Sequence, residues 1–367
     1  MRKNLPDTIL ERKRIHIDTE ALLSELQGKC VLVTGAAGSI GSELVRQIAS
    51  FNPALLLLSD ISESPLHQLS LELQTSFPQL RFIPLVSDIR NQIRMEMIFK
   101  QYLPQHVYHA AAYKHVPLME SHPSESVLTN VWGTKVLSDL AVRYATEVFV
   151  MVSTDKAVNP SNIMGASKRI AEIYVQLLDS RGKFSEEEKT FPRFITTRFG
   201  NVLGSNGSVV LHFEEQIAKG GPITVTHPDI VRYFMSVHEA CQLVLEAGNI
   251  GKGGEIFVFD MGEPVRIVDL AEKMIRFAGL EPYKDIDIIF TGLRPGEKLY
   301  EELLTNSEHF ISTRNKRIMI GVVDHNPEDF SNGKLNETIN RLIELAYHYE
   351  EGKVVEWMKV LVPEFVR

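Results

Sequence analysis

From Lys29 onward the chain alternates between short apolar runs and longer stretches whose apolar residues have helical spacing. Six of the runs are rich in leucine and β-branched residues, and they lie at 30–34, 54–59, 81–86, 106–110, 147–153 and 193–199. They are continuously apolar, which is typical of strands buried on both faces. The alternation predicts an α/β fold, in which a doubly wound parallel sheet carries helices on both faces.

After Arg198 the pattern gives way to segments rich in glycine, asparagine, proline and serine. A helix is predicted at 237–247 and a strand at 255–260, and the tail from 336 to 362 has the spacing of one or two amphipathic helices. We therefore expect a core interrupted by a smaller C-terminal substrate-binding lobe. The predicted division is an N-terminal arm at 1–28, a core at 29–200 plus 236–261, a lobe at 201–235 plus 262–330, and a helical tail at 331–367.

Composition narrows the class of protein. The chain has 367 residues, of which 44% are hydrophobic and 23% charged, as in soluble globular proteins. Its net charge of −8 disfavours nucleic acid and anionic membranes as partners. Its apolar runs are far shorter than the roughly 20 residues that span a bilayer, so we expect no membrane insertion and a cytoplasmic location. The two cysteines predict buried thiols, and the 12 histidines lack metal-ligand spacing, so no metal is expected.

The run at 30–34 leads directly into a glycine-rich turn and a helical stretch. Gly35, Gly38 and Gly41 would let the backbone approach a pyrophosphate and pack the helix closely on the sheet. Asp60 ends the second strand, where a carboxylate accepts hydrogen bonds from an adenosine ribose and repels a 2′-phosphate. The spacing predicts a Rossmann-type site for NAD rather than NADP. The alternative is a glycine turn without a ligand.

The next strand ends extend this prediction. Asp88 is expected at the adenine edge, with an N-cap of the helix near Asn91 as the alternative. The small residues at 110–112 leave room for the cofactor. The residues expected around the cofactor are Gly35, Gly38, Ser39, Ile40, Gly41, Asp60, Asp88, Ile89, Ala110, Ala111, Ala112, Asn130 and Lys168.

The fifth strand ends in a hydroxyl, a carboxylate and an amine, contributed by Thr154, Asp155 and Lys156. Because strand ends of open α/β sheets face the ligand crevice, we predict that these groups are catalytic. The alternatives are a surface ion pair between Asp155 and Lys156 and a turn capped by Thr154. The helix that follows adds Met164 and Lys168.

Six longer motifs occur in order along the chain: TGAAGSIGSELVRQI, HAAAYKHVPLME, TNVWGTKVL, VSTDKAVNPSNIMGASKR, TRFGNVLGSNGSVV and RPGEKLYEEL. Together they resemble the CapD-like polysaccharide-biosynthesis dehydratases of the extended short-chain dehydrogenase/reductase superfamily. The resemblance implies a hydro-lyase with tightly bound NAD. Its substrate would be UDP-N-acetylglucosamine, and its product a UDP-2-acetamido-2,6-dideoxy-4-keto-hexose for surface polysaccharide or glycoprotein glycans.

One position departs from the superfamily. Met164 stands where the superfamily places a tyrosine, four residues before Lys168, and a thioether cannot give or accept a proton. The chain resembles a larger, membrane-anchored branch of the family that carries the same replacement and retains configuration at C5. The N-terminal arm resembles the linker after the membrane segments of that branch. The chain is then either a short soluble member or an excised catalytic portion.

The resemblance implies oxidation at C4 of the sugar, loss of the C6 hydroxyl and reduction at C6. We expect Lys156 to remove the C5 proton if burial and a nearby cation lower its pKa, and a protonated Asp155 to act as the C6 acid. Thr154 would bind the C4 oxygen, and Lys168 the nicotinamide ribose. Three routes stay open for the C4 hydroxyl proton: Asp155, a water or the Lys168 network.

A dianionic diphosphate on an acidic protein requires converging arginines. Arg198, Arg232 and Arg294 lie in segments expected at one crevice, although a single arginine is more often a solvated surface residue. By resemblance, Arg232 and Arg294 approach the diphosphate and Glu297 the uridine ribose. His115 has a packing role as its alternative. The residues expected around the substrate are Lys114, His115, Arg198, Asn201, Ser208, Thr224, Arg232, Arg294 and Glu297.

Two other functions are compatible with these motifs. A C4 epimerase would perform the same oxidation, but epimerases rely on the tyrosine that is missing here. A non-catalytic NAD-binding sensor would need neither the Thr-Asp-Lys cluster nor the arginines. The resemblance also implies a homodimer or a higher homo-oligomer, with the helices at 123–144 and 162–178 as the contact.

Overall fold

The computed structural model describes residues 15, 17–183, 191–302, 308–323 and 333–367. Its centre is a sheet of nine strands in the order β14-β15-β11-β6-β5-β4-β1-β2-β3. The strands are β1 (Cys30–Thr34), β2 (Leu55–Asp60), β3 (Phe82–Val86), β4 (His106–His109), β5 (Val148–Val152), β6 (Arg193–Arg198), β11 (Ile256–Phe259), β14 (Glu308–Ser312) and β15 (Ile318–Val323). The strands from β3 to β11 run parallel, so all six predicted runs and the strand expected at 255–260 are confirmed.

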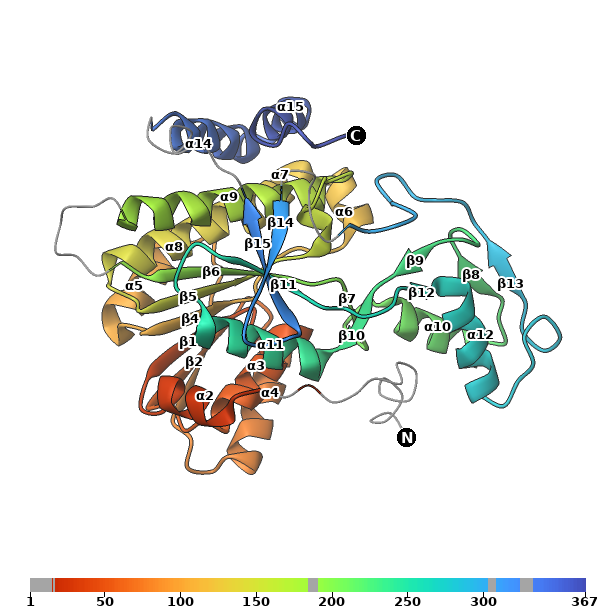
Figure 1. Ribbon diagram of the computed structural model, residues 1–367, viewed down its shortest axis with the longest axis horizontal. Coiled ribbons are helices and arrows are strands. Elements are labelled where there is room, and N and C mark those ends of the chain that lie inside the picture. The colour runs from red at the N-terminus through yellow and green to blue at the C-terminus, as the bar shows by residue number, and fades with distance from the viewer. Residues whose placement is uncertain (1–14, 16, 184–190, 303–307, 324–332) are drawn as a thin grey trace.

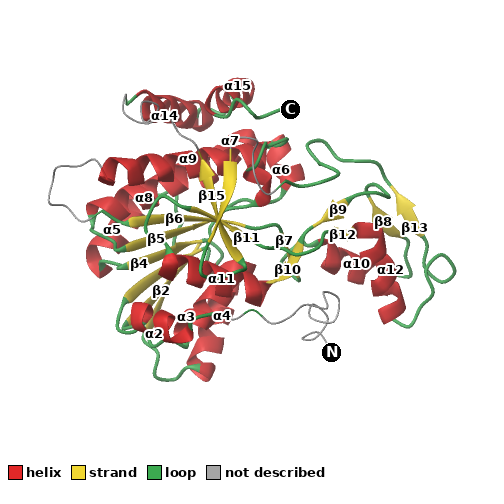
Figure 2. Ribbon diagram, in the orientation of Figure 1, coloured by secondary structure: helices red, strands yellow, loops and turns green. Residues whose placement is uncertain are grey.

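Helices cover both faces of this sheet (Figures 1 and 2). Consecutive strand residues point to opposite faces, so Val31 and Leu56 enter one core cluster while Leu32 and Leu57 enter another. The helices of the first cluster are α2 (Thr19–Leu26), α3 (Ser39–Ala49), α4 (Glu63–Ser76) and α11 (Val237–Ile250). The helices of the second are α5 (Gln92–Tyr102), α8 (Gly133–Arg143), α9 (Ile163–Lys183), α14 (Lys334–Tyr347) and α15 (Glu351–Leu361). The fold is a Rossmann-type doubly wound sheet, as predicted.

A smaller lobe stands beside the carboxyl ends of the parallel strands (Figure 1). Its elements are β7 (Asn201–Leu203), α10 (Val209–Ala218), β8 (Ile223–Val225), β9 (Val231–Arg232), β10 (Phe234–Ser236), β12 (Val265–Arg266), α12 (Ile267–Phe277) and β13 (Ile288–Phe290). Three short pairings, β7 with β10, β8 with β13 and β9 with β12, join its segments around a separate apolar cluster. Two interleaved stretches of chain therefore contribute to this lobe.

One predicted boundary is wrong. The range 262–330 was assigned to the lobe, but β15 pairs antiparallel with β11, and β14 pairs with β15. Without β15, the edge of β11 would leave its backbone groups unpaired. The described residues 308–323 therefore belong to the central sheet, while 324–330 lie outside the described residues.

The tail forms two helices, as predicted, and they change the expectation for assembly. The helices α14 and α15 pack on α9, on α7 (Pro123–Ser126) and on the π-helical turn η1 (Val127–Trp132). The proposed dimer contact at 123–144 and 162–178 is largely buried within the chain. The predicted dimer contact is therefore corrected, because a partner could reach these helices only by displacing α14 and α15.

The N-terminal arm is described only from residue 15, without residue 16. Its helix α2 begins after Asp18, whose side chain accepts a hydrogen bond from the backbone N–H of Ala21. Leu22 and Leu26 are fully buried in the core, so this part of the arm packs on the main body. Across the described ranges, no helix has both the length and the apolar character needed to traverse a bilayer.

Candidate functional site

The turn between β1 and α3 requires glycine at two positions. Gly35 has a φ of +67°, and a Cβ there would lie 2.6 Å from the backbone nitrogen of Ala111. A Cβ on Gly41 would lie 1.9 Å from the Gly35 carbonyl oxygen. Helix α3 begins after Gly38 without a side-chain cap, so its first backbone N–H groups face outward for an anion. This turn has the features of a pyrophosphate site.

Asp60 is fixed at the end of β2. Its Oδ2 accepts a hydrogen bond from the Ala37 backbone N–H at 2.8 Å, and its Oδ1 accepts one from the Ser62 N–H at 2.8 Å. Each carboxylate oxygen keeps a free lone pair for a further donor. The carboxylate lines a cavity of about 300 Å³. That cavity is also lined by Gly35, Gly38, Asp88, Ile89, Ala110, Ala111 and Ala112.

Asp88 is not the N-cap of α5. Asn91 takes that role, since its side chain accepts a hydrogen bond from the Arg94 backbone N–H at 3.0 Å. The Asp88 carboxylate instead pairs with Arg90 at 2.7 Å. Partial burial raises the pKa of Asp88, but the hydrogen bonds and charge of Arg90 outweigh it and hold the pKa below its ordinary value. The N-cap alternative is therefore wrong, and Asp88 stays a prediction for the adenine edge.

Asn130 acts beneath the cavity rather than in it. Its Oδ1 accepts a hydrogen bond from the Tyr113 N–H at 2.9 Å, and its Nδ2 donates to the Tyr113 carbonyl at 3.0 Å and to Ser167 Oγ at 2.9 Å. The side chain is buried and does not line the cavities described here. We correct its predicted role from contacting the cofactor to holding the loop after β4.

A second cavity, of about 810 Å³, lies over the ends of β4 and β5. Its lining includes Ser39, Ile40, Thr154, Lys156, Met164 and Lys168. Lys168 Nζ donates to the Val152 carbonyl at 2.8 Å. Burial lowers the pKa of Lys168 to about 8, against the opposing charge of Glu172. Met164 lies one helical turn before Lys168 and lines the same cavity.

Thr154, Asp155 and Lys156 form one hydrogen-bonded cluster. Thr154 Oγ1 donates to Asp155 Oδ1 at 2.9 Å, and Lys156 Nζ donates to the same oxygen at 3.0 Å. The Asp155 side chain is only 1% exposed, and its Oδ2 has no hydrogen-bond partner among the described residues. Thr154 also caps the short turn that follows, at 3.3 Å from the Lys156 N–H. The surface ion pair is therefore excluded, and the capping role adds to the cluster rather than replacing it.

The electrostatics of Lys156 differ from the prediction. Burial lowers its pKa, but the charges of Asp155 and Glu301 outweigh burial and the repulsion of Arg232, so the pKa is raised. Glu301 Oε1 lies 3.6 Å from Lys156 Nζ and 3.7 Å from Arg232 Nε. Sequence reasoning missed Glu301, although it belongs to the RPGEKLYEEL motif. Only the folded chain shows which carboxylate of that motif turns inward.

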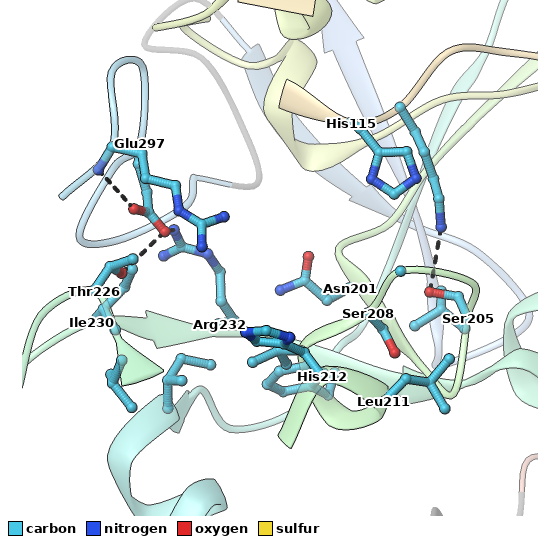
Figure 3. A pocket seen from close by; sticks show the side chains of 18 of the residues that line it. His115, Asn201, Ser205, Ser208, Leu211, His212, Thr226, Ile230, Arg232 and Glu297 are labelled. Atoms are coloured by element: carbon cyan, nitrogen blue, oxygen red, sulfur yellow. Dashed lines mark hydrogen bonds and ion pairs between the residues drawn. The ribbon is translucent and has the colours of Figure 1, made fainter. Parts of the chain in front are cut away.

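A third cavity, of about 750 Å³, lies between the core and the lobe. It is lined by Ser208, Thr224, Arg232, Arg294 and Glu297. Figure 3 shows Arg232 reaching toward Glu297 on one side, with His115 and Ser205 on the other. The second and third cavities share Lys114, His115, Lys156, Asn201, Val202 and Ser205. Of the cluster at 154–156, Lys156 lines both cavities and Thr154 lines the second, while Asp155 lies buried behind them.

Lys114 and His115 line this junction from the loop after β4. Lys114 Nζ donates to Ser205 Oγ at 3.5 Å. Burial lowers the pKa of Lys114, and burial together with the Lys114 charge lowers the pKa of His115. A Cβ on Gly207 would lie 2.5 Å from the His115 ring, so the glycine lets the loop close over it. His115 lines the pocket and is exposed, which contradicts a packing role in the core.

Arg198 is a correction to the predicted diphosphate site. Its side chain is 1% exposed and does not line the three cavities. Its Nε donates to Glu172 Oε1 at 2.9 Å and its NH2 donates to Oε2 at 2.6 Å. Ser153 Oγ donates to the same carboxylate at 2.6 Å. Arg198 therefore stabilises the end of β5, because the Glu172 carboxylate on α9 binds both its guanidinium and the Ser153 hydroxyl.

The chain is similar to known proteins in sequence and in structure. The family described as "Polysaccharide biosynthesis protein" matches residues 31–323. The chain is 47% identical over 320 residues to the "Capsular polysaccharide biosynthesis protein CapD" of Staphylococcus aureus, which covers 87% of this chain and 52% of that protein. It is 48% identical over 303 residues to the "Probable polysaccharide biosynthesis protein EpsC" of Bacillus subtilis (strain 168), covering 82% of this chain and 49% of that protein. The chain thus spans about half the length of these curated relatives.

Among solved structures, Pen from Bacillus thuringiensis has the same fold. The TM-score is 0.73 with 31% sequence identity, and the match covers 85% of this chain and 99% of Pen.

Proposed function

The chain belongs to the polysaccharide biosynthesis protein family, and on that premise we propose that it is an NAD-dependent UDP-N-acetylglucosamine 4,6-dehydratase. The proposed product is a UDP-2-acetamido-2,6-dideoxy-4-keto-hexose with configuration retained at C5. The observation that carries the proposal is the hydrogen-bonded cluster of Thr154, Asp155 and Lys156, which reaches the junction of two cavities through Lys156. An elimination needs an acid and a base beside the hydride exchange, and this cluster supplies both.

The residues of the first two cavities are suited to NAD. The turn at Gly35 and Gly41 has no room for a Cβ, and the start of α3 offers N–H groups to a pyrophosphate. Asp60 would accept hydrogen bonds from the ribose hydroxyls and repel a 2′-phosphate, which favours NAD over NADP. Lys168 would bind the nicotinamide ribose from the wall of the second cavity. When bound, NAD would supply reversible hydride acceptance next to the cluster.

The third cavity is suited to a nucleotide diphosphate sugar. Arg232 and Arg294 would face the diphosphate, for which bidentate guanidinium groups are well shaped. Glu297 is held by the Thr226 hydroxyl at 3.2 Å and by the Arg294 N–H at 3.1 Å, and we assign it to the uridine ribose. Thr224 would lie beside the uracil. The hexose would be surrounded by Lys114, His115 and Asn201 at the junction and by Ser208 in the third cavity.

The first proton is that of the C4 hydroxyl, which must leave as hydride leaves C4. The 2.9 Å hydrogen bond from Thr154 to Asp155 supports a relay. The hydroxyl of Thr154 accepts the C4 proton and passes its own proton to the Asp155 carboxylate. Of the three routes left open by the sequence, this one needs neither a phenol nor a bridging water. It also supplies the protonated Asp155 that the later step requires.

The second proton is that of C5, which the new C4 ketone acidifies. Lys156 acts as the base from its neutral form, which it reaches by releasing its ammonium proton to solvent through the third cavity before turnover, and a neutral Asp155 no longer opposes that release. Lys156 takes the C5 proton, the C5–C6 double bond forms, and Asp155 gives its proton to the C6 hydroxyl, which departs as water. Bound NADH would supply the hydride for C6, and Lys156 returns its proton to C5. Return from the same side retains the configuration.

The alternatives predict different products. A C4 epimerase would give an isomer of unchanged mass, and an NAD-binding sensor would give no product. Purified protein is incubated with UDP-N-acetylglucosamine and NAD in heavy water. The mass of the product is measured by mass spectrometry, and its deuterium content and stereochemistry by NMR. We expect loss of one water and deuterium at C5 with retained stereochemistry. A product of unchanged composition, or inversion at C5, would contradict the proposal.

Two further proposals concern the whole protein. We propose a cytoplasmic site of action and assembly into a homo-oligomer. Because α14 and α15 cover the helix pair first expected at the contact, the subunits would meet through another surface. Sedimentation of the purified chain tests the assembly.

A further inference from the structure

Glu301 connects two parts of the pocket that have different tasks. One of its oxygens, Oε1, lies 3.6 Å from Lys156 Nζ and 3.7 Å from Arg232 Nε. Its side chain is 6% exposed, and those of Lys156 and Arg232 are 17% and 9% exposed. Ion pairs so well shielded from water interact strongly. The single negative charge of Glu301 is thus shared between the Lys156 amine and the Arg232 guanidinium.

Arg232 does not depend on Glu301 alone. Its NH1 donates to the carbonyls of Val231 at 2.7 Å and Leu299 at 3.2 Å, and its NH2 lies 3.5 Å from Glu297. These contacts fix the guanidinium if the charge of Glu301 is removed. Lys156 has fewer supports, which are Asp155 at 3.0 Å and the Asn201 amide oxygen at 3.4 Å. Loss of Glu301 should therefore affect Lys156 more than Arg232.

We propose that Glu301 is a positioning residue that controls when Lys156 holds and when it releases its proton, in response to the diphosphate at Arg232. The inference rests on the proposed dehydratase function. With the third cavity empty, Arg232 and Lys156 share the charge of Glu301. A bound diphosphate offsets the positive charge of Arg232 where it lies, so the charge of Glu301 acts mainly on Lys156. Glu301 then stabilises the ammonium that forms when Lys156 takes the C5 proton.

Other charged groups around Lys156 set the background for this effect. They come from its own turn, from the loop after β4, from α9 and from the lobe, and they are Asp155, Lys114, His115, Lys168, Arg232, Arg294, Glu297 and Glu301. The cations among them lower the pKa of Lys156, and the carboxylates raise it. Asp155 becomes neutral during the proposed reaction. Glu301 is then the nearest remaining carboxylate in the described structure.

The variant Glu301→Gln keeps the shape and removes the charge. The pKa of Lys156 then falls, so the acidic limb of the kcat–pH profile, which reports deprotonation of Lys156, moves to lower pH by about one unit. The plateau kcat falls about tenfold, because a less basic amine is a weaker base. KM for UDP-N-acetylglucosamine changes less than threefold, because Arg232 keeps its other contacts. A change of about this size is what the loss of one weak ion pair produces.

The neighbouring Glu302 provides a matched control. Its side chain is 48% exposed and pairs with Lys298 at 2.9 Å, away from Lys156. Glu302→Gln should leave the pH profile at that of the wild type. Glu301→Asp keeps the charge one methylene farther back and should give an intermediate shift, and it carries the test if Glu301→Gln does not fold.

The outcomes separate the inference from the function beneath it. A shifted limb in Glu301→Gln, an intermediate limb in Glu301→Asp and an unchanged Glu302→Gln support the inference. An unmoved limb in the folded Glu301 variants, or an equal shift in Glu302→Gln, overturns it while leaving dehydration intact. If the wild type forms no dehydrated product, the proposed function itself fails, and the inference fails with it.

Discussion

Replacing Arg198 by methionine separates a buried structural arginine from a ligand-binding one. In the fold Arg198 makes two hydrogen bonds to Glu172, and both side chains are almost completely buried. Methionine fills much of the same space but leaves the Glu172 carboxylate with hydrogen bonds from Ser153 and Arg169. Burial of a carboxylate that has lost its main cation is costly. We therefore expect a loss of stability and not a loss of nucleotide binding.

The magnitude follows from the burial of the pair. Removal of one partner of a buried ion pair costs about 3–5 kcal/mol. Unfolding entropy of about 2 cal/mol/K per residue, taken over 367 residues, gives roughly 0.8 kcal/mol/K. A loss of about 4 kcal/mol should then lower Tm by about 5 °C. In the double variant Glu172→Gln with Arg198→Met the stranded charge is gone, so about half of the loss should return.

Thermal unfolding and titration with UDP are measured side by side, with Arg232→Met as the comparator. Arg198→Met should lower Tm and bind UDP with the affinity of the wild type. Arg232 lines the third cavity, so Arg232→Met should weaken UDP binding at least tenfold with a smaller change in Tm. An unchanged Tm with lost UDP binding in Arg198→Met would refute this reasoning and restore Arg198 to the diphosphate site.

Three other predictions concern the cofactor, the missing phenol and pH. Asp60→Ala should bring the Kd for NADP to within tenfold of that for NAD, because the carboxylate no longer repels a 2′-phosphate; an unchanged ratio in a fluorescence titration would argue against this role. Met164→Leu should keep kcat within threefold, since the proton path proposed here bypasses the thioether; a loss of about 100-fold would show that Met164 does more than fill space. Burial lowers the pKa of His106 to about 4 from 6.5, with the charge of Glu147 opposing. Between these values the unfolded chain binds a proton that the folded chain does not, so the unfolding free energy falls as pH drops from 6.5 to 4, by roughly 3 kcal/mol for this group. Urea unfolding of His106→Gln should show a weaker pH dependence over that window, and an identical slope would contradict the assignment.

The sequence predicted features that depend on neighbouring residues. The six apolar runs became parallel strands, and five of them are mostly buried, whereas the edge strand β3 leaves Pro84 and Val86 exposed. Gly35 and Gly41 were recognised because the turn between strand and helix needs them in any Rossmann-type fold. The cluster at Thr154 to Lys156 was found for the same reason, since the end of a strand fixes where its side chains face.

Features that depend on distant partners were not predictable from local sequence. Arg198 and Arg232 both end short strands, yet Arg198 meets Glu172 beneath the sheet and Arg232 lines a cavity. The pKa of Lys156 is raised, against the expectation, because the charge of Asp155 and that of Glu301, which approaches from a segment far along the chain, outweigh burial. Asn130 was placed on the cofactor, whereas its amide holds the backbone of Tyr113. In each case the partner, and not the residue itself, decides the role.

The most direct test of the central claim follows the hydride of C4. The chain is supplied with NAD and with UDP-N-acetylglucosamine that carries deuterium at C4, and the product is examined by NMR and mass spectrometry. If the chain is a 4,6-dehydratase, the product has lost one water and carries the deuterium at C6. Deuterium that remains at C4, with the mass of the substrate unchanged, would contradict the account.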